Sequence, residues 1–116
     1  MLRHFCKSKI SKVRVTQAEL FYEGSVTIDE DLLKAADILS GEKVELLNLN
    51  NGSRVETYAI AGKKGSGVIC LNGPAARSGC VRDELVILCY CLADEKEIKS
   101  LKTKVIHVDG KNRIRN

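Results

Sequence analysis

Short runs of alternating apolar and polar residues, separated by glycine and asparagine, dominate the chain. Alternation with a period of two is typical of strands that are buried on one face. The run at 84–92 is the most apolar, so we expect a central buried strand there, and a last edge strand at 105–108. The full set of predicted strands is 2–10 continuing through 12–15, 25–28, 43–49, 54–61, 68–71, 84–92 and 105–108.

Two short segments predict helices instead. Asp29 suits a helix N-cap, and a short apolar face follows it before Gly41 ends the segment. Residues 94–101 predict a second helix. Turns are predicted at Asn50-Asn51-Gly52, at 72–74, and in a mobile glycine-rich loop over 62–67, which lacks the Walker spacing of a phosphate-binding loop.

The length of 116 residues predicts one domain over 1–116. Apolar residues make up 44% and charged residues 29%, which excludes a disordered chain and favours an ordinary globular domain. At least six strands with only two short helices favour a compact β-barrel, since closing the sheet removes its exposed edges.

The net charge of +4 is mild, and part of the excess lies near the end of the chain. A nucleic-acid surface would show a denser basic stripe with interleaved aromatic residues, whereas the chain has three Tyr, two Phe and no Trp. We therefore expect a solvated tail and no nucleic acid. A non-enzymatic β-barrel that binds nucleic acid or protein through this basic end stays open as the alternative function.

Location and metal binding are predicted from equally simple features. The first residues contain no signal peptide, and no apolar stretch is long enough to span a membrane. An odd number of cysteines without a secretion signal predicts reduced thiols and a cytoplasmic protein. No C-x-x-C pair is present, so no zinc site is expected. The five cysteines are Cys6, Cys70, Cys80, Cys89 and Cys91.

Familiar catalytic patterns are missing, but one Gly-Ser pair stands apart. No G-x-S-x-G motif occurs, and His4 and His107 lie far apart in the sequence. Of three Gly-Ser pairs, those at 52–53 and 65–66 belong to turns, which is the default interpretation. The pair Gly24-Ser25 instead interrupts a β-type sequence.

Several motifs at matching spacing give the chain a family resemblance. It resembles the bacterial aspartate 1-decarboxylases over most of residues 1–92. The resemblance implies a six-stranded double-psi β-barrel and a homotetramer with sites between subunits. It also implies decarboxylation of L-aspartate to β-alanine and CO₂ for pantothenate biosynthesis. The matching motifs are Lys9-Ile10, Tyr22-Glu23-Gly24-Ser25, Ile28-Asp29, Asn51-Gly52 with Arg54, Thr57-Tyr58-Ala59-Ile60, Asn72-Gly73-Pro74-Ala75-Ala76-Arg77 and Gly79 to Leu88.

The family makes its own cofactor, which implies that this chain is cut between Gly24 and Ser25 into 1–24 (β chain) and 25–116 (α chain). Ser25 Oγ would attack the Gly24 carbonyl and convert the amide to an ester. β-Elimination and hydrolysis would then leave a covalent pyruvoyl group in place of Ser25. That group forms a Schiff base with aspartate and accepts the electrons released with CO₂. Spontaneous cleavage and cleavage assisted by a maturation factor both stay open.

The resemblance also assigns roles to four residues of the first two-thirds of the chain. Tyr58 matches the proton donor, and Thr57 matches a contact to substrate that also serves processing. Lys9 and Arg54 match the groups that hold the carboxylates of aspartate, where charge-assisted hydrogen bonds are strong. Without the resemblance, these four would be interpreted as a barrel tyrosine, an ordinary β-former and two surface charges.

A second group of residues matches the turn beside the pyruvoyl group. Asn72 and the backbone of Gly73, Pro74 and Ala75 match a segment that contacts substrate, and Tyr22 would help to bound the site. Two positions depart from the family pattern. Ser11 stands where many members have histidine, so no role is transferred there, and Pro74 stands where alanine is common, which a turn tolerates.

Overall fold

The computed structural model describes residues 1–115 and consists mainly of strands. Each segment that was expected to be a strand or helix forms one, and the structure adds a three-residue strand and a short 3₁₀ helix. The elements are β1 (Arg3–Arg14), β2 (Gln17–Glu19), β3 (Ser25–Asp29), α1 (Glu30–Ala36), β4 (Lys43–Asn48), β5 (Arg54–Gly62), β6 (Ile69–Asn72), η1 (Gly73–Arg77), β7 (Glu84–Ala93), α2 (Glu95–Ser100) and β8 (Lys104–His107).

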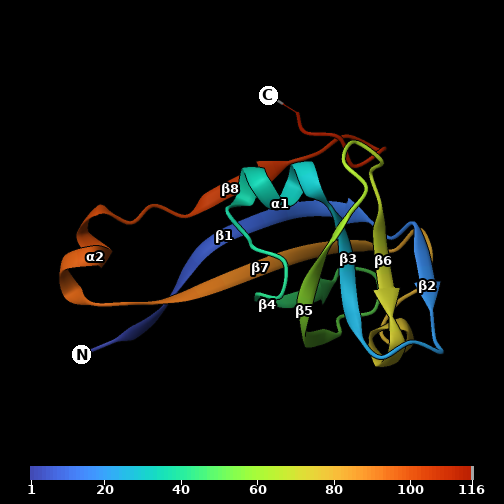
Figure 1. Cartoon of the computed structure of the whole chain (residues 1–116), viewed down its shortest axis with the longest axis horizontal. Helices are drawn as coiled ribbons and strands as arrows, with labels where there is room; N and C mark the ends of the chain where they lie inside the picture. Colours follow the sequence, from blue (N-terminus) through green and yellow to red (C-terminus); the bar gives the residue numbers. More distant parts are fainter. Residues whose placement is uncertain (116) are drawn as a thin grey trace.

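The strands close into a barrel because β1 and β2 act as one bent strand. The hydrogen-bonded order is β2-β6-β3-β5-β4-β7-β1-β8. Between β1 and β2 the Thr16 N–H donates to the Ile69 carbonyl (2.9 Å), and the Ile69 N–H donates to Thr16 Oγ1 (2.9 Å). The β1–β2 strand therefore pairs with β7 along one part and with β6 along the other, which gives a ring of six strands. β8 lies outside this ring, parallel to β1 at the edge (Figure 1).

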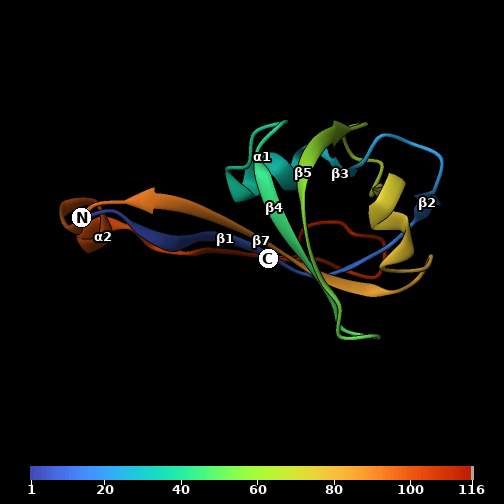
Figure 2. The ribbon, with the colours of Figure 1, turned by 90° about the horizontal axis from the view of Figure 1, so that it is seen from below.

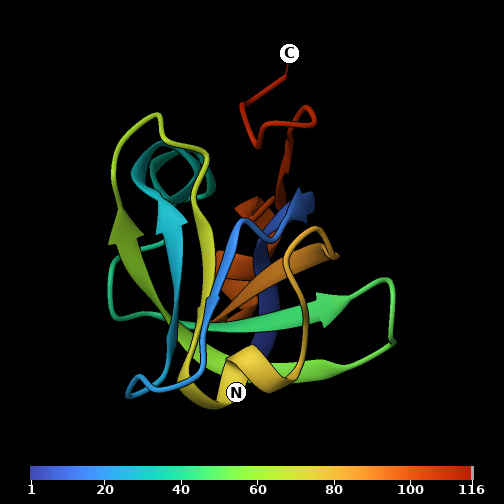
Figure 3. The ribbon, with the colours of Figure 1, turned by 90° about the vertical axis from the view of Figure 1, so that its right-hand side faces the viewer.

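The interior of the ring is apolar, as the alternation predicts. In β4, for example, Val44 and Leu46 point inward with 1% and 2% exposure, while their neighbours do not. α1 covers one end of the barrel and buries Leu32, Leu33 and Ala36 (Figure 3). β7 lies between β4 and β1, which confirms its predicted interior position in the sheet.

Asp29 fastens the glycine-rich loop to the start of α1. Its Oδ1 accepts hydrogen bonds from the backbone N–H groups of Asp31 (2.9 Å) and Gly65 (3.0 Å), and its Oδ2 from Gly67 (2.8 Å). Asp29 is thus the predicted N-cap. The loop expected to be mobile is instead tethered at two points, because one buried carboxylate satisfies backbone donors on both segments.

An arm projects from the barrel. Figure 2 shows the N-terminal half of β1 and the C-terminal half of β7 extending away from it together, with α2 at the tip. Tyr90 and Leu92 on this arm are 38% and 57% exposed, and α2 buries none of its residues. Within residues 1–115, no helix is long and apolar enough to cross a membrane.

Candidate active site

The backbone at Ser25, where β3 begins, has an unusual conformation. Its φ is 123°, directly after Gly24 at 120°. The other non-glycine residues of 1–115 with positive φ lie between 56° and 82°, in or near the left-handed helical region. Ser25 lies well outside that region, which costs about 1–3 kcal/mol and requires surroundings that hold it there. The side chain is also buried, at 1% exposure.

Asn72 holds the Ser25 side chain. The two residues are opposite each other in the antiparallel pairing of β3 and β6. Asn72 Nδ2 donates to Ser25 Oγ (2.9 Å) and to Thr27 Oγ1 (3.0 Å), while its Oδ1 accepts from Cys70 Sγ (3.2 Å). Asn72 is 3% exposed, so these contacts lie in a water-poor environment where they are strong.

Gly73 brings the next segment against the loop that contains Gly24. It has φ 63°, and a Cβ placed there would collide with the Tyr22 carbonyl oxygen and lie 2.7 Å from the Gly24 nitrogen. Only glycine permits this approach. The predicted turn at 72–74 continues as η1, with Pro74 in its first turn and Ala75 buried. The loop and η1 lie together at one end of the barrel (Figures 1 and 3).

Tyr58 and Thr57 lie on β5, which runs parallel to β3. Val26 is paired with Ala59, so one step back along both strands brings Tyr58 level with Ser25. Tyr58 is 44% exposed, and Thr57 is half-buried. The structure therefore places this part of β5 beside the start of β3.

Lys9 and Arg54 lie apart from this cluster. Lys9 is paired with Leu88 on β7 and with Val105 on β8. Arg54 begins β5, and its Nη1 forms an ion pair with Glu45 Oε2 (3.2 Å). Among residues 1–115, no hydrogen bond or ion pair joins either cation to Ser25 or Asn72.

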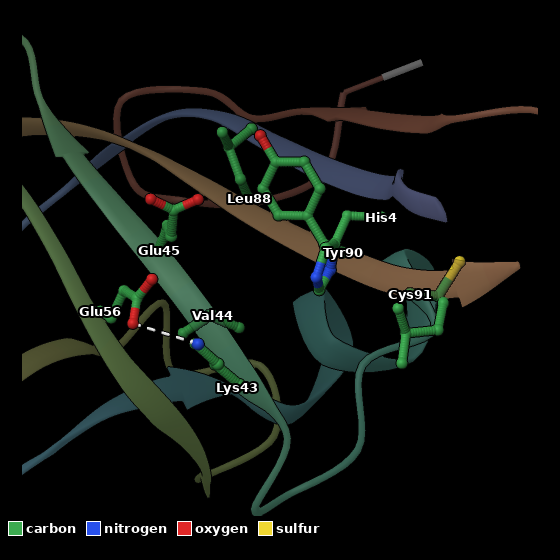
Figure 4. Close-up of a pocket in the computed structure, with 9 residues that line it drawn as sticks. His4, Lys43, Val44, Glu45, Glu56, Leu88, Tyr90 and Cys91 are labelled. Carbon is green, nitrogen blue, oxygen red and sulfur yellow. Dashed lines mark ion pairs between the residues drawn. The ribbon is translucent and has the colours of Figure 1, made fainter. Parts of the chain in front are cut away.

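A hollow of about 530 Å³ lies elsewhere, between the arm and β4 (Figure 4). An ion pair between Lys43 Nζ and Glu56 Oε2 (3.1 Å) crosses one side of it. None of the predicted site residues lines it. The lining residues are His4, Lys43, Val44, Glu45, Glu56, Leu88, Tyr90, Cys91 and Leu92.

Sequence reasoning missed Thr27 and Cys70, the other two partners of Asn72. Both carry a recognisable signal. Thr27 lies two residues after Ser25, and Cys70 two residues before Asn72, so on a strand each shares a face with its neighbour in the site. No group of His, Cys, Asp and Glu that could hold a metal ion occurs in the described part of the chain.

Comparison with known proteins decides the family. A family model described as aspartate decarboxylase matches residues 1–115. This chain belongs to the aspartate decarboxylase family. It is 52% identical over 113 residues to the aspartate 1-decarboxylase of Thermoanaerobacter pseudethanolicus, covering 97% of each chain. It is 55% identical over 113 residues to that of Syntrophobacter fumaroxidans, covering 97% of this chain and 91% of the relative.

For this aspartate decarboxylase family member, a solved structure confirms the fold. The crystal structure of the rationally designed mkDPBB_sym_86 protein, a double-psi β-barrel, matches with a TM-score of 0.50 at 17% identity. The match covers 66% of this chain and 90% of the design. The six-stranded double-psi β-barrel with short helices that the family resemblance implied is thus confirmed.

Proposed function

We propose that this chain decarboxylates L-aspartate to β-alanine and CO₂, as a step toward pantothenate. We further propose that it is made as a precursor that cuts itself between Gly24 and Ser25. Family membership supports the reaction. One observation supports the cleavage above all others: a buried serine with φ 123° whose hydroxyl is held by Asn72.

Cleavage begins when Ser25 Oγ attacks the Gly24 carbonyl carbon. The C–N bond breaks, and the nitrogen of residue 25 takes up the hydroxyl proton, so that an ester replaces the amide. The Asn72 N–H that points at Ser25 Oγ (2.9 Å) stabilises negative charge as that proton leaves. Release of the strained backbone at Ser25 favours the same step.

The ester then provides a leaving group. Loss of the Ser25 Cα proton expels the Gly24 carboxylate and leaves dehydroalanine at position 25. Addition of water and loss of ammonia convert this to a pyruvoyl group at the start of the second fragment. The balance requires one water molecule and no oxidant, since the oxidation level is conserved between serine and pyruvoyl plus ammonia.

The residues around position 25 fit such a group. It is no larger than the serine it replaces, and the Asn72 amide and the Thr27 hydroxyl provide polar contacts beside it. The pyruvoyl group supplies an electrophilic carbonyl that takes up the electrons released with CO₂. Tyr58, level with Ser25 in the β3–β5 register, would deliver the proton to the former α-carbon, with Thr57 beside it.

Lys9 and Arg54 would hold the carboxylates of aspartate, which supports a homotetramer with sites between subunits. In one chain these cations form no hydrogen bond or ion pair with the Ser25 cluster within residues 1–115, so a neighbouring copy would have to complete the site. The exposed Tyr90 and Leu92 on the arm give such a copy an apolar surface to cover. A cytoplasmic location and a maturation factor stay predictions from the sequence.

Intact-mass spectrometry of the purified protein tests the proposal. We expect fragments 1–24 and 25–116, the second beginning with a pyruvoyl group. Ser25→Ala should stay whole and release no CO₂ from aspartate, whereas Ser53→Ala, in another Gly-Ser pair, should be cut normally. A wild-type chain that stays whole after prolonged warming, with or without cell extract, contradicts self-cleavage and favours the binding-module alternative. CO₂ release by Ser25→Ala contradicts the cofactor.

The role of Tyr58 is tested separately. Tyr58→Phe removes only the hydroxyl, so cleavage should proceed while β-alanine forms more slowly. Tyr90→Phe on the arm is the matched control and should leave both rates unchanged. Unchanged turnover in Tyr58→Phe would exclude Tyr58 as the proton donor.

A further inference from the structure

Cys70 has no part in the function so far, yet it contacts the residue that holds Ser25. It lies on β6 two residues before Asn72, and its side chain is buried at 4% exposure. Its Sγ lies 3.2 Å from Asn72 Oδ1. We propose that Cys70 is a positioning residue: its thiol donates to Asn72 Oδ1 and so turns the NH₂ group of Asn72 toward Ser25. This inference rests on the proposed role of Ser25 as the nucleophile of self-cleavage.

The amide of Asn72 needs such a partner because its two ends have similar shapes. Ser25 and Thr27 contact it through hydroxyl groups, and a hydroxyl both donates and accepts hydrogen bonds. These two residues therefore do not decide which end of the amide faces them. Cys70, on the other side of the amide, contacts it through a thiol and not through a hydroxyl group.

A protonated thiol favours one of the two orientations. With the carbonyl toward Cys70, the S–H group donates to Oδ1, and both N–H groups of the amide meet hydroxyl oxygens. In the reversed orientation one N–H group would face sulfur, which is a weak acceptor. Burial raises the pKa of the Cys70 thiol, and the nearby Glu19 carboxylate raises it further, so the donor proton is retained.

The orientation matters for the cleavage step. In the observed arrangement the amide N–H points at Ser25 Oγ and stabilises the negative charge that this oxygen carries as its proton leaves. In the reversed arrangement the amide carbonyl would accept a hydrogen bond from the Ser25 hydroxyl, hold the proton on Oγ, and oppose the developing charge. Loss of the Cys70 donor should therefore slow cleavage even in a folded protein.

The experiment compares side chains at position 70 with and without a donor. Cys70→Ser and Cys70→Thr keep an O–H group, while Cys70→Ala and Cys70→Val lack one, and Thr and Val have nearly the same shape. The uncut precursor of each is isolated early, and its cleavage rate is followed by intact mass. We expect Cys70→Ser and Cys70→Thr to cleave within a few-fold of the wild-type rate. Cys70→Ala and Cys70→Val should cleave about tenfold more slowly, as loss of one hydrogen bond predicts.

The matched control is Cys89→Ala, another buried cysteine, whose thiol contacts the Lys43 carbonyl on the other side of the barrel. It should cleave at the wild-type rate. If Cys70 had a structural role alone, the cleavage rate would follow the volume of the side chain at position 70. Cys70→Thr and Cys70→Val would then cleave at the same rate, and that result overturns the proposal. Equal rates in wild type and all folded variants also overturn it. If wild type itself stays whole, the proposed function fails first, which separates the two failures.

Discussion

The contact between Gly73 and the loop that precedes Ser25 leads to a quantitative prediction. Gly73→Ala adds one methyl group where the Tyr22 carbonyl oxygen and the Gly24 nitrogen already lie. Both neighbours are backbone atoms, so no side chain can move aside. The substitution should therefore destabilise the protein and displace the residues on which the proposed self-cleavage depends.

The expected size follows from two independent costs. Alanine at φ 63° costs about 1–2 kcal/mol, because L-residues crowd the carbonyl in the left-handed region. Forcing a methyl group into filled space adds about 1–3 kcal/mol. Gly73→Ala should thus cost about 2–5 kcal/mol. Gly52→Ala should have only the cost of the positive φ, because φ is 76° but nothing lies within 4 Å of the added Cβ.

The assay is urea unfolding at one fixed protein concentration, in a Ser25→Ala background so that every chain stays whole. With an m-value of about 2 kcal/mol per molar urea, Gly73→Ala should lower the midpoint by about 1–2.5 M. Gly52→Ala should lower it by less than about 1 M. Gly110→Ala, with open space and no positive φ, should leave it unchanged or raise it slightly. Equal midpoints for Gly73→Ala and Gly52→Ala would refute the close approach.

Three further predictions concern other parts of the barrel. Asp29→Asn should lower the free energy of unfolding by about 1–3 kcal/mol, because the backbone N–H group of Gly67 in the glycine-rich loop loses its charged acceptor. Urea unfolding measures this change. For Glu42, burial would raise the pKa, but hydrogen bonds, first among them that from Lys7, outweigh it and bring the pKa below its usual range. The stabilisation from the ionised Glu42 carboxylate is present above about pH 4.3 and is lost as the pH falls through the lower pKa of Glu42 in the folded protein. Glu42→Gln has no such carboxylate, so its unfolding midpoint should decline less steeply in acid than that of wild type. Burial raises the pKa of Cys89 to about 12, so a maleimide at pH 7.5 should label the exposed Cys80 and leave Cys89 unmodified, as peptide mass mapping would show.

The fold could be predicted largely because the pattern of this chain is local. The alternation around Val44 and Leu46 in β4 shows which of these residues face the core, the continuously apolar run of β7 indicates an interior strand, and Asp29 marks the start of α1. β2 could not be predicted in this way. It has three residues, of which only Ala18 is half-buried, and it exists because the end of β1 bends toward β6. That pairing depends on contacts between residues more than 50 positions apart, which no short window contains.

The candidate site likewise has one part that the sequence predicts and another part that only the structure shows. Gly24, Ser25 and Asn72 belong to motifs that the sequence displays, and the structure brings them together. The strained backbone at Ser25 is visible only in the structure, where β3 and β6 pair, whereas the contact from Cys70 to Asn72 lies within β6 and follows from their spacing on one strand. Lys9 and Arg54 lie apart from Ser25 within one chain, so the role proposed for them would require a neighbouring copy, which neither the sequence pattern nor a single chain contains.

The pairing pattern also explains how the barrel could survive a cut between Gly24 and Ser25. This bond lies between β2 and β3, and both of these strands pair with β6, one parallel and one antiparallel. The first fragment would still hold β1 between β7 and β8, and the second would still hold all of β3. No ladder between strands crosses the cut bond, so cleavage removes a strained connection without removing a strand pair. A strained serine is therefore tolerated where it is, because the surrounding strands hold both ends of the chain independently of the bond between them.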